Sequence, residues 1–117
     1  MPIEIHKQFF ETRKQVFDDL AASDLWPHTF ITEASPALPL HWHDADIVGY
    51  VLEGETWLLD EHGDRLDFVK GDKLVLPHGT LHAEGETNGR MIYIVATTDT
   101  RPVHEFLQLK SPDDLPA

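Results

Sequence analysis

The sequence predicts an all-β domain with one amphipathic helix near its N-terminus, and two patterns carry this prediction. After Asp24, short runs rich in β-branched and aromatic residues alternate with glycine, proline and acidic residues at intervals of about ten. Before it, residues 7–22 place apolar side chains on one face at helical spacing. About eight short strands in one small domain imply a β-sandwich or a closed β-barrel.

The helix is predicted over residues 7–22. Apolar side chains populate one side and charged side chains the other, as in a helix that packs on the outside of a sheet. We expect the apolar face to cover the protein's own interior rather than to bind a partner. The apolar positions are Phe9, Phe10, Val16, Phe17, Leu20 and Ala21.

The barrel is predicted over residues 28–98, and the breaks between its strands have chemical causes. Pro36 interrupts strand pairing, Gly63 lies in a predicted hairpin turn, and the pair Asn88-Gly89 suits a turn with positive φ. The predicted strands are residues 28–33, 39–43, 47–53, 55–60, 65–69, 73–76, 80–84 and 90–97.

The C-terminal part of the chain has a less regular pattern. Residues 103–109 carry spaced apolar side chains that fit either a final amphipathic turn or an edge strand. Residues 111–117 contain two prolines and two aspartates, which predicts a loose tail.

Length and composition restrict the classes of function. At 117 residues the chain is expected to form one domain, residues 1–117, around one core. It has no cysteine, so a metal ion would be held by imidazole and oxygen ligands alone. The 21 acidic and 9 basic residues give a formal charge of −12, which argues against binding to nucleic acid or a membrane surface. Without a signal-peptide pattern or a long apolar run, the sequence predicts a cytoplasmic protein.

Two segments place three histidines where neighbouring strands can bring them together. Side chains alternate between the faces of a strand, so His41 and His43 project the same way, about 7 Å apart, and Trp42 points to the other face. We expect Trp42 to pack against the helix or a second subunit rather than to bind substrate. In the second segment Gly79 permits a tight reversal before His82 begins the next strand.

These segments resemble the two motifs of the cupin superfamily, G-x5-H-x-H-x3–4-E-x6-G and G-x5-P-x-G-x2-H-x3-N. The resemblance covers residues 41–86 and implies a double-stranded β-helix, also called a jelly-roll barrel. It further implies that His41, His43 and His82 hold a metal ion. The matched positions are His41, His43 and Gly54 in the first motif and Gly71, Pro77, Gly79 and His82 in the second, with Glu86 in place of the asparagine.

The glutamate of the first motif is missing, because Ile47 stands at its position. In the cupin motif this glutamate is the fourth metal ligand, and an isoleucine side chain cannot bind a metal. Asp46 is adjacent, but in a regular strand it points away from the histidines unless a bulge intervenes. Glu84 is a better substitute, since it follows His82 on the same face of one strand. It is a candidate fourth ligand or proton-transfer group, or a hydrogen-bond acceptor for an imidazole.

The ligand set indicates the kind of chemistry. Three neutral imidazoles around a divalent ion leave positions open for water, dioxygen or a chelating substrate. Iron or manganese would favour oxygenation of an enediol, diketone or hydroxy acid, whereas zinc or nickel would favour isomerisation or elimination. The three-histidine set is similar to the dioxygenase type of cupin site. We therefore expect a dioxygenase-like metalloenzyme that chelates a small polar organic substrate, with Glu84 as the candidate catalytic residue.

A second hypothesis comes from a different class. Ile47 can also mark a degenerate metal site in a non-catalytic cupin that binds or senses a small molecule. The two hypotheses differ in metal content, since only the first predicts one tightly bound divalent ion per chain. His78 is a further candidate for the rim of the pocket, and the resemblance also implies a homodimer.

Overall fold

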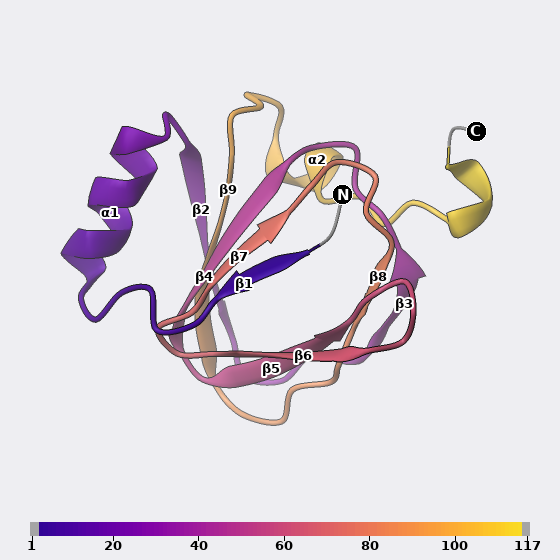
Figure 1. Ribbon diagram of the computed structural model, residues 1–117, viewed down its shortest axis with the longest axis horizontal. Helices are drawn as coiled ribbons and strands as arrows, with labels where there is room; N and C mark the ends of the chain where they lie inside the picture. The colour runs from indigo at the N-terminus through magenta and orange to yellow at the C-terminus, as the bar shows by residue number, and fades with distance from the viewer. Residues whose placement is uncertain (1–2, 116–117) are drawn as a thin grey trace.

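The structure, a computed structural model, describes residues 3–115 as two antiparallel sheets that together form a barrel, with one helix packed outside it (Figure 1). The predicted all-β barrel is therefore confirmed. One sheet has the strand order β1-β7-β4-β9-β2 and the other the order β3-β8-β5-β6. The strands are β1 (Glu4–His6), β2 (Trp26–Thr32), β3 (Leu38–His41), β4 (Ile47–Glu53), β5 (Glu55–Leu59), β6 (Arg65–Val69), β7 (Lys73–Leu76), β8 (His82–Glu84) and β9 (Met91–Thr97).

Three short helical segments accompany the strands. They are α1 (Arg13–Ala22), α2 (Val103–Phe106) and the 3₁₀ turn η1 (Pro112–Asp114). Residues 103–109 were expected to form either a final amphipathic turn or an edge strand, and α2 shows that they begin with a helical turn. Of the predicted loose tail, residues 111–115 contain η1, and residues 116–117 lie outside the described residues. Within residues 3–115, every helix is too short or too polar to cross a membrane.

β4 lies in the middle of the five-stranded sheet and separates two clusters of buried side chains. Ile47 and Val51 point into the barrel, where they join the larger cluster. Val48, Tyr50 and Leu52 alternate with them and point outwards, towards α1. A continuous apolar run therefore serves both faces of this strand, which explains why its sequence lacks the polar alternation of a half-exposed strand.

α1 begins at Arg13 rather than at residue 7, so the predicted start of the helix is wrong. Gln8 has a φ of 50°, which a helix cannot accommodate. The helix begins instead at a capping box, in which the Thr12 side chain accepts the Gln15 N–H and the Gln15 side chain accepts the Thr12 N–H. Residues 4–6 form β1, which the sequence analysis did not predict.

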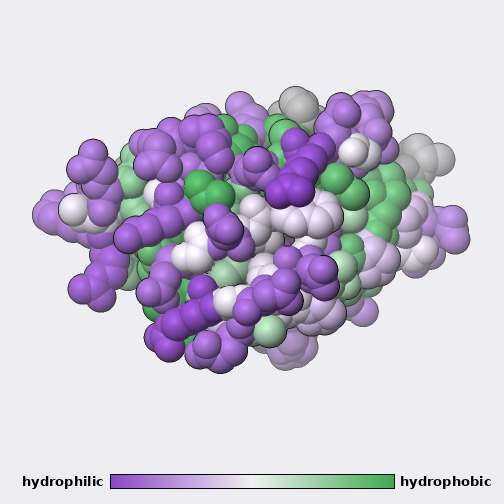
Figure 2. Space-filling model, turned by 90° about the horizontal axis from the view of Figure 1, so that it is seen from below, coloured by the Kyte–Doolittle hydropathy of each residue, from purple (hydrophilic) through white to green (hydrophobic). Residues whose placement is uncertain are grey.

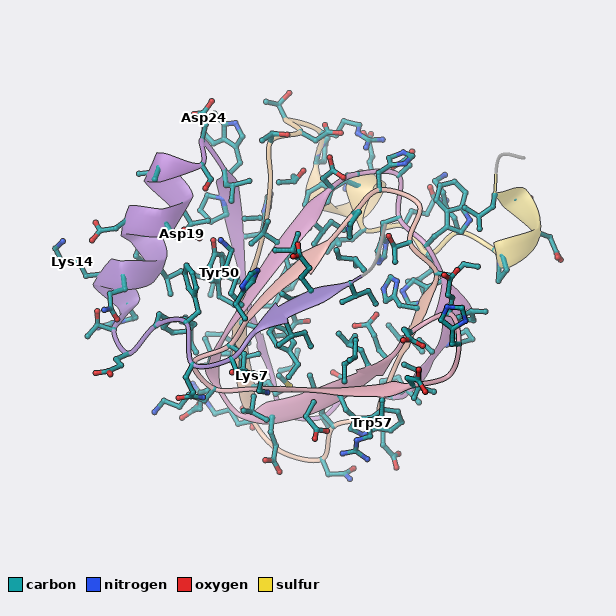
Figure 3. The ribbon with its side chains drawn as sticks, viewed as in Figure 1. Lys7, Lys14, Asp19, Asp24, Tyr50 and Trp57 are labelled. Atoms are coloured by element: carbon teal, nitrogen blue, oxygen red, sulfur yellow. The ribbon has the colours of Figure 1, made fainter. Side chains whose placement is uncertain are left out.

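Only part of the predicted apolar face of the helix is buried. Phe10, Val16 and Leu20 pack against the outer side of β4, whereas Phe9 and Phe17 are exposed. A polar contact completes the docking of α1. The Asp19 carboxylate accepts hydrogen bonds from the Tyr50 hydroxyl at 2.6 Å and Lys73 Nζ at 2.7 Å (Figure 3). Burial acts to raise the pKa of Asp19, but the hydrogen bonds from Lys73 and Tyr50 outweigh it and lower that pKa.

The outer face of β5 and β6 is largely hydrophilic (Figure 2). Trp57 lies on this outer side, where Arg65 stacks over its ring at 4.8 Å (Figure 3). Its indole also covers Gly85, because a Cβ added there would come within 2.1 Å of the ring. Thr56 and Leu58, which alternate with Trp57, line the inside of the barrel.

A buried aspartate joins the N-terminal segment to the turn before β7. Asp72 is fully buried, accepts the N–H groups of Gln8 at 2.9 Å and Val69 at 3.0 Å, and forms an ion pair with Lys7. Burial acts to raise the pKa of Asp72, but the hydrogen bonds from Lys7, Val69 and Gln8 lower it overall. The preceding Gly71 has a φ of 96°, which explains the glycine in the second motif.

We expect Asp72→Ala to lower the free energy of unfolding by about 1–3 kcal/mol, because it leaves two buried N–H groups without an acceptor. The measurement is urea denaturation at pH 7, with the exposed Asp67→Ala as control. Since folding depresses this pKa, the stabilisation is present above the unfolded pKa of about 4 and is lost as the pH falls below it. A difference between wild type and variant that stays constant from pH 7 to pH 2 would contradict this account.

Candidate metal centre

Strand register brings two of the three histidines together. His41 is the last residue of β3 and His82 the first of β8, and the antiparallel pairing sets them directly opposite each other. His43 follows in the loop after β3. The ring centroids are 4.2 Å apart for His41 and His82, 4.9 Å for His41 and His43, and 5.2 Å for His43 and His82. All three side chains are buried.

A backbone carbonyl orients each imidazole ring. Nδ1 of His41 lies 2.6 Å from the Pro39 carbonyl and Nδ1 of His82 lies 3.0 Å from the Thr80 carbonyl. Nδ1 of His43 lies 3.2 Å from the carbonyl of Gln108, which is remote in sequence. A carbonyl can only accept, so each Nδ1 carries a proton and Nε2 is the ring nitrogen available to a metal ion. Histidines that bind metals are oriented in this way.

The Glu84 carboxylate completes the group. Its Oε2 lies 3.2 Å from His41 Nε2 and 4.0 Å from His82 Nε2. One ligand atom from each of the four side chains lies within 4.8 Å of the other three, close enough to hold a single metal ion. His41 Nε2 is buried and has no well-formed hydrogen bond within the described part of the chain. This orphaned nitrogen and the donor set both fit a divalent transition metal.

The surroundings favour neutral imidazoles at His43 and His82 and an ionised carboxylate at Glu84, whereas at His41 they favour the protonated ring, whose proton a metal ion would have to displace. Burial, together with the neighbouring His82 and His41, lowers the pKa of His43 to about 4, and burial also lowers the pKa of His82. Burial acts to lower the pKa of His41 as well, but the Glu84 carboxylate and the Pro39 carbonyl raise it overall. For Glu84, burial is outweighed by the histidines, which lower its pKa. The carboxylate is therefore ionised at neutral pH.

Asp46 and His78, two further candidates, stand outside this group. Asp46 Oδ1 accepts the His78 N–H at 2.8 Å, and the Gly79 N–H donates to the His43 carbonyl at 3.0 Å. These bonds join the loop after β3 to the turn before β8 and so position His43 beside His82. The His78 side chain is exposed and does not line the cavity described below.

The C-terminal segment covers Trp42 and thereby positions Gln108. Trp42 and Lys110 exchange two backbone hydrogen bonds, at 3.0 and 3.1 Å, and Trp42 Nε1 donates to the Ser111 carbonyl at 2.8 Å. The expectation that Trp42 packs against the helix or a second subunit is therefore wrong, because residues 108–111 of its own chain bury it. Arg101 also links the segment after β9 to the loop after β3, because it donates hydrogen bonds to the carbonyl and the carboxylate of Asp44.

A cavity of about 350 Å³ opens inside the barrel beside the histidines. His43, His82 and Glu84 form part of its wall. Ile47, which occupies the position of the motif's glutamate, also lines it, so this part of the wall is apolar. Further apolar lining comes from β5, β6, β7, β9 and the C-terminal segment, with Leu58, Phe68, Leu74, Met91, Val95, Leu107 and Leu109.

Solved structures from several organisms are similar to this chain. A DUF861 family protein from Thermotoga maritima is 18% identical, with a TM-score of 0.60, and the match covers 82% of this chain and 99% of that one. A cupin-2 domain containing protein from Shewanella frigidimarina is 20% identical, with a TM-score of 0.52, over 62% of this chain and 69% of that one. The chain has the cupin fold.

An enzyme is also among the structures similar to this chain. The salicylate 1,2-dioxygenase from Pseudoaminobacter salicylatoxidans is 16% identical, with a TM-score of 0.53, over 63% of this chain and 20% of that one. No protein-family model and no curated protein sequence matches the chain. At these identities the comparisons establish the fold, and the chemistry has to be argued from the site itself.

Sequence reasoning named the four converging side chains of this site but missed the groups that orient them. The Pro39 and Thr80 carbonyls each lie two residues before the histidine that they orient, so local spacing could have suggested them. The Gln108 carbonyl had no signal in the sequence, because a backbone acceptor is independent of residue type and this one is remote from His43.

We expect Trp42→Phe to lower the free energy of unfolding by about 1–2 kcal/mol through the lost hydrogen bond and the smaller ring. It should also speed amide hydrogen exchange at Lys110, whose N–H donates to the Trp42 carbonyl. The control is Trp26→Phe, because Trp26 is 60% exposed. Unchanged exchange at Lys110 would contradict the role given to Trp42 in holding this segment.

Proposed function

We propose that this cupin is a metal-dependent enzyme of the dioxygenase type. It binds one divalent transition metal ion through Nε2 of His41, His43 and His82, with the Glu84 carboxylate as the fourth ligand. Its substrate is a small organic molecule that chelates the ion from the cavity. Cytoplasmic location and homodimer formation stay predictions from the sequence.

The observation that carries the proposal is the convergence of three imidazoles whose Nδ1 atoms all face backbone carbonyls. Structural histidines in a core satisfy both ring nitrogens, whereas here one ligand atom from each of the three imidazoles and the Glu84 carboxylate lies within 4.8 Å of the others. Three neutral ligands and one anion leave a divalent ion with a net charge of +1, so the site still attracts an anionic chelating group.

The side chains of the chain have separable roles at this site. His43, His82 and Glu84 form part of the cavity wall, so a chelating substrate approaches from that side. Glu84 is the only carboxylate among the described lining residues. It is therefore placed to accept a proton from a hydroxyl of the substrate as the substrate becomes an anionic chelate.

The bound metal supplies the part of the reaction that the side chains cannot. An iron or manganese ion held by these residues would supply the redox chemistry that dioxygen needs to react with the substrate. Ile47, Leu58 and Phe68 give the cavity apolar walls, which a substrate body contacts.

We expect freshly purified protein to contain about one equivalent of iron or manganese per chain, measured by elemental analysis. His82→Ala should lose this metal, because two histidines and a carboxylate bind a divalent ion far more weakly than the complete set. The control is His62→Ala, because the His62 side chain is 75% exposed in a hairpin turn. Oxygen uptake on a panel of enediols, diketones and hydroxy acids should follow the metal content.

Two outcomes would overturn the proposal. Zinc or nickel without oxygen uptake would indicate Lewis-acid chemistry rather than oxygenation. A metal content that is equal in His82→Ala and wild type, or negligible in both, would favour the non-catalytic hypothesis, in which Ile47 marks a degenerate site.

We expect Glu84→Gln to weaken metal affinity by about 10–100-fold, because the amide oxygen is neutral and a poorer ligand. The measurement is competition with a chromophoric chelator at pH 7. Glu86→Gln is the matched control, because Glu86 is exposed in the same segment. Equal affinity in both variants would show that Glu84 lies outside the ligand set.

A further inference from the structure

The cavity beside the metal centre contains no cationic side chain. Among its described lining residues there is no lysine or arginine, and the one charged group of fixed sign is the Glu84 carboxylate. Apart from the histidines, the walls are formed mainly by aliphatic and aromatic side chains. A second anionic group on a ligand would therefore be buried without a counter-ion, at a high cost in free energy.

Two hydroxyl groups in the wall have no protein partner. The Oγ1 atoms of Thr32 and Thr87 are buried and make no hydrogen bond within residues 3–115. Both residues line the cavity, and Thr87 is only 9% exposed. A buried hydroxyl without a partner is unfavourable, and rotation of a lining threonine about its Cα–Cβ bond would turn this hydroxyl towards a ligand in the cavity.

These hydroxyls lie at the end of the cavity away from the histidines. Ile47 begins β4 directly after the loop that carries His43, whereas Thr32 pairs with Met91 beside the last residues of β4. Thr87 bridges to Ser35, in the connection that follows Thr32. Thr87 follows Glu84 by only three residues, so their Cα atoms are at most about 11 Å apart, a distance that a single ring with short substituents can span.

Building on the proposed function, we propose a substrate with three parts. A single chelating head binds the metal, an uncharged apolar body fills the barrel, and a neutral hydroxyl or carbonyl group reaches Thr32 and Thr87. This sharpens the expected small polar substrate into a largely apolar molecule. The volume of about 350 Å³ is near the lower end of ligand pockets, about 300–1,000 Å³, and suits a single ring with short substituents.

The first test keeps the head constant and varies the body. Metal-loaded protein is titrated calorimetrically with acetohydroxamate, benzohydroxamate and the monohydroxamate of succinate. We expect benzohydroxamate to bind at least about tenfold more tightly than acetohydroxamate, because the ring buries apolar surface. The succinate derivative should bind no more tightly than acetohydroxamate. A preference for the charged body would overturn the proposed substrate class and leave the metal site intact.

The second test examines the threonine end. We expect 4-hydroxybenzohydroxamate to bind about 2–10-fold more tightly than benzohydroxamate, since it adds one hydrogen bond. Thr87→Val, which has nearly the same shape, should remove this difference and keep the affinity for benzohydroxamate. Thr29→Val on the exposed side of β2 is the control. Equal weakening of both ligands by Thr87→Val, or no effect on either, would overturn the role of Thr87.

A third arm separates this inference from the proposed function. Protein treated with a chelator has no metal ion to bind a chelating head. The probes are therefore toluene and p-cresol, which lack one, and their binding is measured from the NMR chemical shifts of cavity residues. We expect p-cresol to bind more tightly than toluene in wild type and equally in Thr87→Val. If these affinities are found but the purified protein contains no metal, the proposed function is rejected and the assignment of the cavity is kept. The absence of saturable binding of either probe would reject the cavity assignment.

Discussion

The candidate site depends on the register that sets His41 directly opposite His82 in the pairing of β3 with β8. A slip of one residue would turn one of these side chains to the outer face of the sheet and separate the two rings. The same register carries Glu84, because it follows His82 on the same face and reaches His41 Nε2. Two strands thus supply three of the four converging groups, and only His43 needs a separate means of orientation.

That separate means is the C-terminal segment, which couples the geometry of the site to the wall of the cavity. Gln108 orients His43 through its carbonyl, and the adjacent Leu107 and Leu109 line the cavity. Movement of this segment would change the ring orientation of His43 and the shape of the pocket together. The backbone pairing of Trp42 with Lys110 holds the segment in place, so a buried tryptophan outside the site influences its geometry.

Strand periodicity predicted the parts of this protein that depend on local pattern. Alternation placed His82 with Glu84 on one face of β8, whereas β3 ends at His41 and His43 is held by contacts of the loop that follows. The predicted start of α1 was wrong because the positive φ of Gln8 is incompatible with a helix, and the residue type does not reveal this φ. The covering of Trp42 and the contact from Gln108 join residues that are far apart in sequence. Such contacts depend on how the whole chain packs and have no local signal.

The position of the carboxylate links the metal centre to the character of the cavity. In the cupin motif the glutamate would stand at Ile47 on β4, facing into the barrel. Here that wall is apolar, and the carboxylate comes from Glu84 on β8, beside His82. The donor set keeps its charge, while β4 presents only apolar atoms or glycine to the interior between Ile47 and Val51. A ligand body lying along β4 therefore meets an apolar wall on that side, and this favours an apolar molecule with a polar group at each end.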